Sequence, residues 1–183
     1  MREHSKINFG RLLAASSVLA LAGIGVTAAS AATLPAADAS AEATAPPATV
    51  RDLHVGVKPI DNSSAGHYYV WLTFKNTSHH RVSMYGYSGV SFVAYGNGTQ
   101  VGLPTGWEHN RRPHRVVLAP GAKTKELVTI TDAGVYGGRT VRTDGFRVYI
   151  PDSRAAVFVP YKTRATTRHV RQLAVEPVGA KIP

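Results

Sequence analysis

Residues 68–78, with the sequence YYVWLTFKNTS, decide the fold class. Their β-branched and aromatic side chains favour a pleated, half-buried surface. Alternate side chains of a strand point to opposite faces of its sheet. The two faces of this strand carry Val70, Leu72 and Phe74 on one side and Tyr69, Trp71 and Thr73 on the other. Because the first face is wholly apolar and the second is largely aromatic, we predict a central strand. The turn-forming residues 76–78 end it.

The chain after residue 50 repeats this alternation in shorter runs. Turn residues separate the runs, and no run in this part has apolar residues at helical spacing. Pro59 is expected to end the first strand, Gly96-Asn97-Gly98 to form a hairpin, and Pro120-Gly121 to form a type II turn. Eight or nine short strands predict an all-β protein, an antiparallel β-sandwich over residues 50–178.

The N-terminal residues have the composition of a leader. Three basic residues precede an uncharged, mostly apolar run, and Ala29-Ser30-Ala31 is a small-x-small cleavage pattern. We predict a signal peptide over residues 1–31, followed by a disordered Ala/Pro-rich linker over residues 32–49. The alternative is an uncleaved membrane anchor, since the uncharged run is long enough to span a bilayer.

Charge and cysteine content restrict the function. The 183 residues hold 21 Lys and Arg against 11 Asp and Glu, a net charge of +10. The first 50 residues contain three of each sign, so the whole excess belongs to the predicted domain. Such a surface attracts polyanions or anionic membranes. There is no cysteine, which excludes disulfides, thiolate metal sites and cysteine nucleophiles.

Four segments occur in an order found in a known family. L-x-F-x-N-T-S, G-Y-x-G-V-S-F-V, G-x-x-V-G and L-x-P-G begin at residues 72, 86, 98 and 118. Over residues 52–175 the chain resembles DUF4232, an actinobacterial secreted domain of unknown function. The resemblance implies an immunoglobulin-like sandwich and no reaction. Family members often carry a disulfide with one cysteine near the position of Val82 and Ser83. This chain resembles a cysteine-free variant, which must rely on core packing.

An irregular basic segment is the best candidate for a binding site. Arginine presents a planar fork suited to phosphate or carboxylate, and tryptophan can stack on a sugar or a base. The candidate contact residues are Trp107, His109, Arg111, Arg112, His114 and Arg115. They would contact an anionic polymer, either a wall polymer, an acidic polysaccharide or a nucleic acid. The alternative is a solvated loop whose charges keep the protein soluble.

A second basic stretch accompanies the last strand. It contains Lys162, Arg164, Arg168, His169 and Arg171. Cations on an edge strand oppose edge-to-edge aggregation, and this is the role we expect for them.

Catalytic and metal-binding patterns are missing from the sequence. His79-His80, and His109 with His114, have no third ligand at a suitable spacing, so we predict no metal and no other cofactor. Neither G-x-S-x-G nor S-x-x-K occurs, and the carboxylates are scattered. The sequence thus predicts a monomeric, non-enzymatic module, secreted or cell-wall-associated, without a membrane span in its mature form. A membrane-tethered protein-interaction domain and an enzyme of unrecognised type stay open as alternatives.

Overall fold

The structure, a computed structural model, describes residues 45–179. The predicted signal peptide and most of the predicted linker lie outside these residues. No helix in the described part of the chain is long and apolar enough to cross a membrane.

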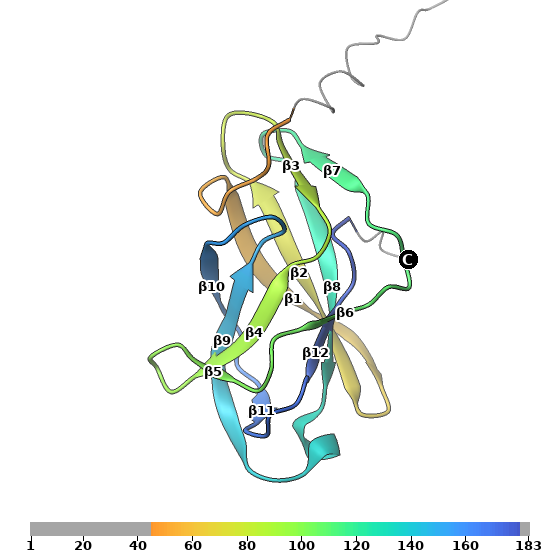
Figure 1. Cartoon of the computed structure of the whole chain (residues 1–183), viewed down its shortest axis with the longest axis vertical. Coiled ribbons are helices and arrows are strands. Elements are labelled where there is room, and N and C mark those ends of the chain that lie inside the picture. Colours follow the sequence, from red (N-terminus) through yellow and green to blue (C-terminus); the bar gives the residue numbers. More distant parts are fainter. Residues whose placement is uncertain (1–44, 180–183) are drawn as a thin grey trace, which may run out of the picture. The chain divides into compact units, whose positions relative to one another are not determined.

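Twelve strands in three sheets make up residues 45–179, which confirms the predicted all-β class (Figure 1). The first sheet has the order β1 (Leu53–Ser64), β2 (His67–Asn76), β8 (Lys123–Thr131), β12 (Leu173–Val175) and β6 (Gly106–Trp107). The second has the order β10 (Ala156–Pro160), β9 (Thr140–Tyr149), β4 (Gly89–Ala94) and β5 (Thr99–Val101), and β11 (Arg164–Thr166) also pairs with β9. The third contains β3 (Val82–Tyr85) and β7 (Arg115–Leu118), and one 3₁₀ turn, η1 (Ala133–Tyr136), precedes β9.

The predicted number of strands and their uniform direction were wrong. The structure has three or four more strands than expected. Two of its strands, β6 and β11, are too short to show an alternating pattern. Furthermore, β12 pairs with β6 in parallel, whereas the other pairings between named strands are antiparallel. A two-residue strand at a sheet edge can adopt this direction because it follows an irregular connection rather than a hairpin.

The first strand is longer than predicted. It continues through Pro59 to Ser64, with a shift of register against β2 between Pro59 and Ser63. Proline lacks a backbone N–H. Because β1 is an edge strand, it has no second neighbouring strand with which the missing donor would have to pair. The connection between β1 and β2 is therefore a tight turn at residues 65–66.

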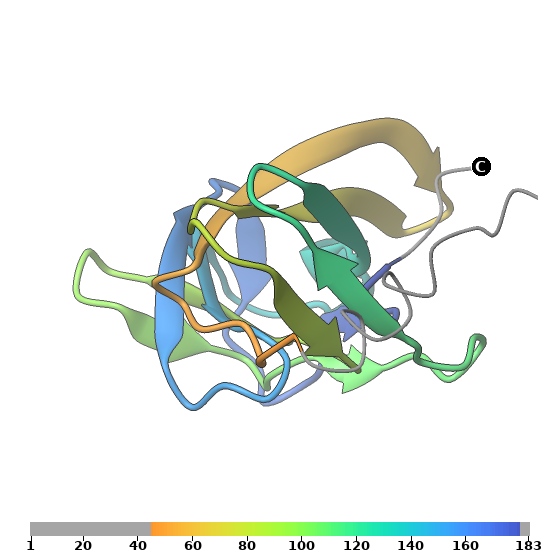
Figure 2. The same cartoon turned by 90° about the horizontal axis from the view of Figure 1, so that it is seen from above.

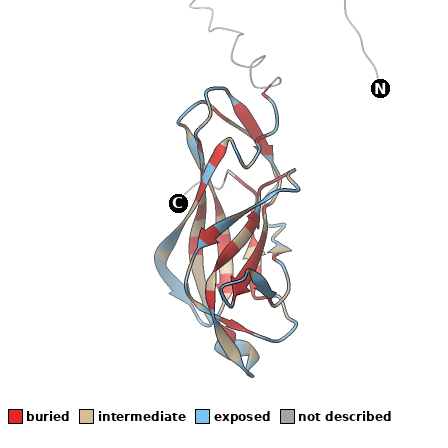
Figure 3. Ribbon diagram, turned by 90° about the vertical axis from the view of Figure 1, so that its left-hand side faces the viewer, coloured by how far each residue is buried: buried red, intermediate tan, exposed pale blue. Residues whose placement is uncertain are grey.

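The central position of β2 is confirmed. It lies between β1 and β8, and the side chains of Val70, Leu72 and Phe74 are fully buried. Burying each is worth roughly 1.5–3 kcal/mol. Both five-stranded sheets contribute to the same hydrophobic core, in which Phe92 stacks on Phe146 with ring centroids 5.2 Å apart. Figure 3 shows the buried residues along the strands and the exposed ones mainly at the loops and sheet edges.

Residues 45–48 of the predicted linker contact the domain. Ala45 and Ala48 are buried, and Ala48 N–H donates to the carbonyl of Ser83 at 2.8 Å. Ser83 N–H in turn donates to the carbonyl of Pro46 at 2.7 Å. Figure 2 shows this segment, in orange, beside β3. The described chain thus joins the sheet before the predicted domain boundary at residue 50.

Candidate functional site

The indole of Trp107 forms an exposed aromatic surface at the edge of the first sheet. β6 is held there by its parallel pairing with β12, and Glu108 N–H donates to Val175 O at 2.8 Å. The Trp107 side chain is 59% exposed. Its ring lies nearly parallel to that of Tyr87, with centroids 5.2 Å apart and an interplanar angle of 10°. Trp107 is thus both accessible and held in one orientation.

Two further contacts fix the position of Tyr87. The His109 ring meets it edge-on, with centroids 5.7 Å apart and an interplanar angle of 72°. The Tyr87 hydroxyl donates to Glu108 O at 3.3 Å and lies 3.3 Å from His109 Nδ1. We call Tyr87, Trp107 and His109 the aromatic shelf. The shelf unites two of the predicted site residues with a tyrosine that the sequence did not single out as a site residue.

A hollow of about 460 Å³ lies beside the aromatic shelf, lined by Trp107, His109 and Arg171 among others. Arg171 comes from the second basic stretch. Its Nη1 donates to the carbonyls of Pro104 and Thr105 at 3.2 and 3.0 Å, and these bonds hold the guanidinium at the hollow. Among the described residues no carboxylate pairs with it. Arg171 therefore adds a positive charge beside Trp107. The sequence did not reveal this neighbourhood, because the two residues are far apart along the chain.

Arg111 does not contribute a free charge. Its guanidinium lies 2.7 Å from Glu176 Oε2, and the other carboxylate oxygen of Glu176 accepts from Asn110 at 3.3 Å. An arginine that already neutralises a carboxylate gains less from a second anion. Arg111 is accordingly a structural link between the basic segment and the chain after β12.

The remaining predicted residues are placed apart from the shelf hollow. Arg112 and His114 are exposed and line a smaller hollow of about 180 Å³ together with Arg111. Arg115 begins β7, and its Nη1 donates to Ser83 Oγ on the paired strand at 2.9 Å. The six predicted residues thus divide into the Trp107–His109 part, the Arg111–His114 part and Arg115.

Comparison with known families identifies the domain. The family model described as "Domain of unknown function (DUF4232)" matches residues 48–179. The chain belongs to the DUF4232 family. A comparison with curated proteins found no significant match. The match confirms the resemblance read from the four sequence segments.

One other part of this DUF4232 domain brings together charged groups that lie apart in the sequence. Lys162 and Arg164 of the second basic stretch line a hollow with Arg142, which lies on β9. Sequence reasoning missed this group because Arg142 belongs to a separate strand, and only the pairing of β9 with β11 unites the three.

Titratable groups with shifted pKa values are few in the described part of the DUF4232 domain. Burial raises the pKa of Glu126 to about 8, and it also raises the pKa values of Tyr68 and Tyr161. A hydrogen bond from the Thr49 hydroxyl lowers the pKa of Asp52. Within residues 45–179 no three His, Asp or Glu side chains gather closely enough to hold a metal ion. The site thus offers stacking and positive charge.

Proposed function

We propose that this DUF4232 protein is a secreted or cell-envelope-associated, non-enzymatic module that binds an anionic polymer at the aromatic shelf. The observation that carries the proposal is the exposed indole of Trp107, held parallel to Tyr87. A fixed aromatic surface can stack on a sugar ring or a base, and stacking contributes about 1–3 kcal/mol per base. The neighbouring Arg171 and the net charge of +10 attract the polymer.

The proposed contact uses only some of the residues of the basic segment. Arg111 is paired with Glu176, and Arg115 does not line the hollow beside the aromatic shelf, so neither is assigned to the ligand. Trp107, His109 and Arg171 form the contact, and Arg112 adds an exposed charge nearby in the chain.

The proposed module is an immunoglobulin-like sandwich and a monomer. The two five-stranded sheets that share one core, and the family membership, support this architecture. The leader predicted over residues 1–31 supports export.

The test is salt-dependent retention on immobilised polygalacturonate, repeated with a single-stranded oligonucleotide and with uncharged dextran. We expect Trp107→Ala to elute at lower salt than the wild type and to lose about tenfold in affinity, the equivalent of about 1.4 kcal/mol. Trp71→Phe leaves Trp107 as the single indole, whose fluorescence then reports binding directly.

Charge-matched variants separate a site from general electrostatics. Arg112→Ala and Lys123→Ala each remove one exposed cation, and Lys123 lies on β8, away from the basic segment in sequence. We expect the first to weaken retention more than the second. Equal losses from both, together with unchanged binding by Trp107→Ala, would refute the shelf, because screened attraction between net charges depends little on position.

A further inference from the structure

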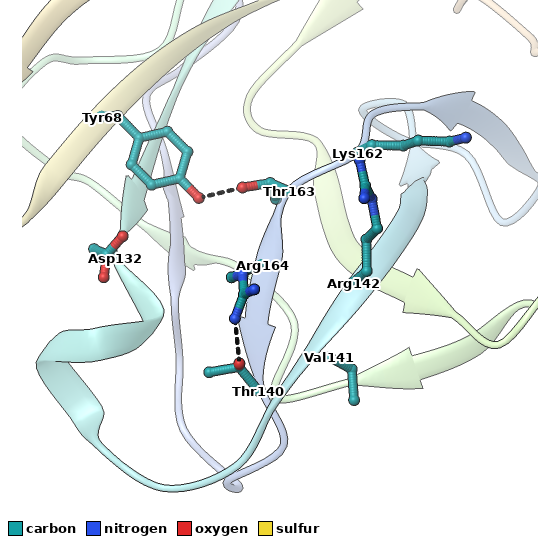
Figure 4. A pocket seen from close by; sticks show the side chains of 8 residues that line it. All are labelled: Tyr68, Asp132, Thr140, Val141, Arg142, Lys162, Thr163 and Arg164. Atoms are coloured by element: carbon teal, nitrogen blue, oxygen red, sulfur yellow. Dashed lines mark hydrogen bonds between the residues drawn. The ribbon is translucent and has the colours of Figure 1, made fainter.

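The hollow lined by Arg142, Lys162 and Arg164 has a volume of about 500 Å³ and lies where β11 pairs with β9, with Tyr68 of β2 on one side (Figure 4). We call it the basic hollow. Its volume is within the range of about 300–1,000 Å³ that is usual for small-molecule sites. The basic hollow shares no lining residue with the hollow beside the aromatic shelf.

Two arginines of the basic hollow are direct neighbours across the strand pair. Arg142 of β9 and Arg164 of β11 are register partners, so their side chains leave the same face of the sheet. Like charges in this relationship are unfavourable. Among the described residues the Arg142 side chain has no hydrogen-bond or ion-pair partner, and the Arg164 side chain has only the Thr140 hydroxyl, at 3.5 Å. In Figure 4 the Arg142 guanidinium extends toward Lys162 and that of Arg164 is directed at Thr140, so both flexible side chains would turn toward an anion bound between them.

Lys162 adds a third cation, and Asp132 is the one carboxylate among the lining residues. One Asp132 oxygen accepts from Gly134 N–H at 2.7 Å and caps the 3₁₀ turn η1. In Figure 4 Asp132 lies on the Tyr68 side, and the ammonium of Lys162 extends away from Arg164. The lining thus keeps an excess of two positive charges.

Hydroxyl groups occupy the other part of the basic hollow. The Tyr68 hydroxyl and Thr163 Oγ1 are 2.8 Å apart, and Thr140 Oγ1 accepts from Arg164. Tyrosine carries its proton at neutral pH, and burial raises the pKa of Tyr68 further. Hydroxyl groups both donate and accept, so they suit a ligand that itself carries hydroxyls.

We propose that the basic hollow binds an acidic sugar, with the carboxylate between Arg142 and Arg164 and the sugar hydroxyls toward Tyr68 and Thr163. Arginine forks match a carboxylate with two parallel hydrogen bonds. The inference goes beyond the aromatic shelf and rests on other residues. An inorganic anion would satisfy the arginines but would leave the hydroxyl groups without a ligand partner.

The test is a titration of the isotope-labelled protein with sodium glucuronate, followed by the amide resonances of residues 140–142 and 162–164. Sodium acetate tests the carboxylate alone, glucose tests the hydroxyls alone, and sodium chloride matches the ionic strength. We expect saturable shifts with glucuronate, weaker binding of acetate and none of glucose. Arg142→Gln and Arg164→Gln should each lose at least fivefold in affinity, whereas Arg154→Gln, an exposed arginine outside the hollow, should not.

Asp132→Asn provides a gain-of-function control, since an amide oxygen can still cap η1 while the repelling charge is lost. We expect it to bind glucuronate more tightly than the wild type. Glucuronate shifts no larger than those from chloride, equal affinity for acetate and glucuronate, or full binding by both arginine variants would overturn the proposal. Trp107→Ala should leave glucuronate binding intact, so failure of the aromatic shelf and failure of the basic hollow are distinguishable.

Discussion

The carboxylate of Glu126 accepts a hydrogen bond from the backbone N–H of Ser88, with Oε1 and N 2.8 Å apart. Glu126 lies on β8 of the first sheet, and Ser88 immediately precedes β4 of the second. Glu126 is fully buried, and its Oε2 and the Ser88 Oγ have no hydrogen-bond partner in the described structure. This polar contact between the two sheets is therefore incompletely hydrogen-bonded. Burial is the main influence on the pKa of Glu126.

Stability should fall as pH rises through the neutral range. Burial raises the pKa of Glu126 from 4.5 to about 8, against the opposing effect of its hydrogen bonding with Ser88. The folded state then keeps a proton that the unfolded chain loses above pH 4.5, so the stabilisation is complete below 4.5 and is lost up to about 8. The expected decrease is on the order of 5 kcal/mol, measured by urea unfolding at about pH 5 and about pH 9.

Glu126→Gln isolates this effect, because the amide has the same shape and does not titrate. We expect its unfolding free energy to be nearly independent of pH over the same interval. Asp61→Asn, at an exposed position of β1, should keep the pH dependence of the wild type. A Glu126→Gln protein with the wild-type pH profile would assign the dependence to other groups.

Asn76 should be essential to the turn after β2. Its buried side chain donates to His80 O and Leu118 O at 2.8 and 2.9 Å, while its Oδ1 accepts from Ser78 N–H and Oγ. Asn76→Ala should cost about 2–4 kcal/mol in urea unfolding, because the buried carbonyl of Leu118 and the partly buried carbonyl of His80 both lose their donor. Asn76→Asp keeps the acceptor oxygen and removes the donor, so this variant should be no more stable than Asn76→Ala.

Asn97 is the matched control for Asn76. Its Oδ1 accepts from Thr99 N–H and Oγ1 in the same arrangement, but the side chain is exposed and no bond from its amide nitrogen to a buried carbonyl is seen in the described structure. Asn97→Ala should cost about 1 kcal/mol or less. Equal losses at the two positions would show that the turn alone, not the buried donors, stabilises the fold.

The alternating pattern predicted much of this fold from local sequence. The hairpin at residues 96–98 joins β4 to β5, and at the Pro120-Gly121 turn Gly121 has φ of 79° and Ala122 N–H donates to Ala119 O at 2.9 Å. Both predictions are confirmed, since such turns depend on neighbouring residues. Glu126, Val128 and Ile130 are alternate residues of one strand, so they share a face. The sequence therefore already contained a signal that the carboxyl group of Glu126 is buried.

The candidate sites depend on contacts between distant segments, which periodicity does not reveal. Arg111 meets Glu176 across 65 positions, so its charge could not be judged from the basic segment alone. Arg142 and Arg164 meet only through β11, a three-residue strand without an alternating apolar pattern. Trp107 was recognised from its residue type, whereas its support by Tyr87 required the folded chain.

Gly145 should tolerate no side chain. A Cβ atom there would overlap the carbonyl oxygen of Val159 on β10 and approach the Phe158 ring within 2.8 Å. We expect Gly145→Ala to cost about 3 kcal/mol or more, because backbone atoms cannot move away without breaking the β9–β10 pairing. Gly89→Ala is the control: its nearest contact would be Tyr149 Cβ at 3.5 Å, so its unfolding midpoint should change little. Similar midpoints for both variants would mean that β10 adapts freely.

The arginine pair should lower the stability of the ligand-free domain. Because Arg142 and Arg164 are directly opposite, Arg142→Gln and Arg164→Gln should each raise the unfolding free energy, by about 0.2–1 kcal/mol. The double variant should gain little beyond either single one, since the repulsion is lost once, and a double-mutant cycle measures this coupling. High salt should reduce the coupling by screening. Additive effects would show that the two arginines do not repel each other, and destabilisation by both single variants would show that they stabilise the sheet.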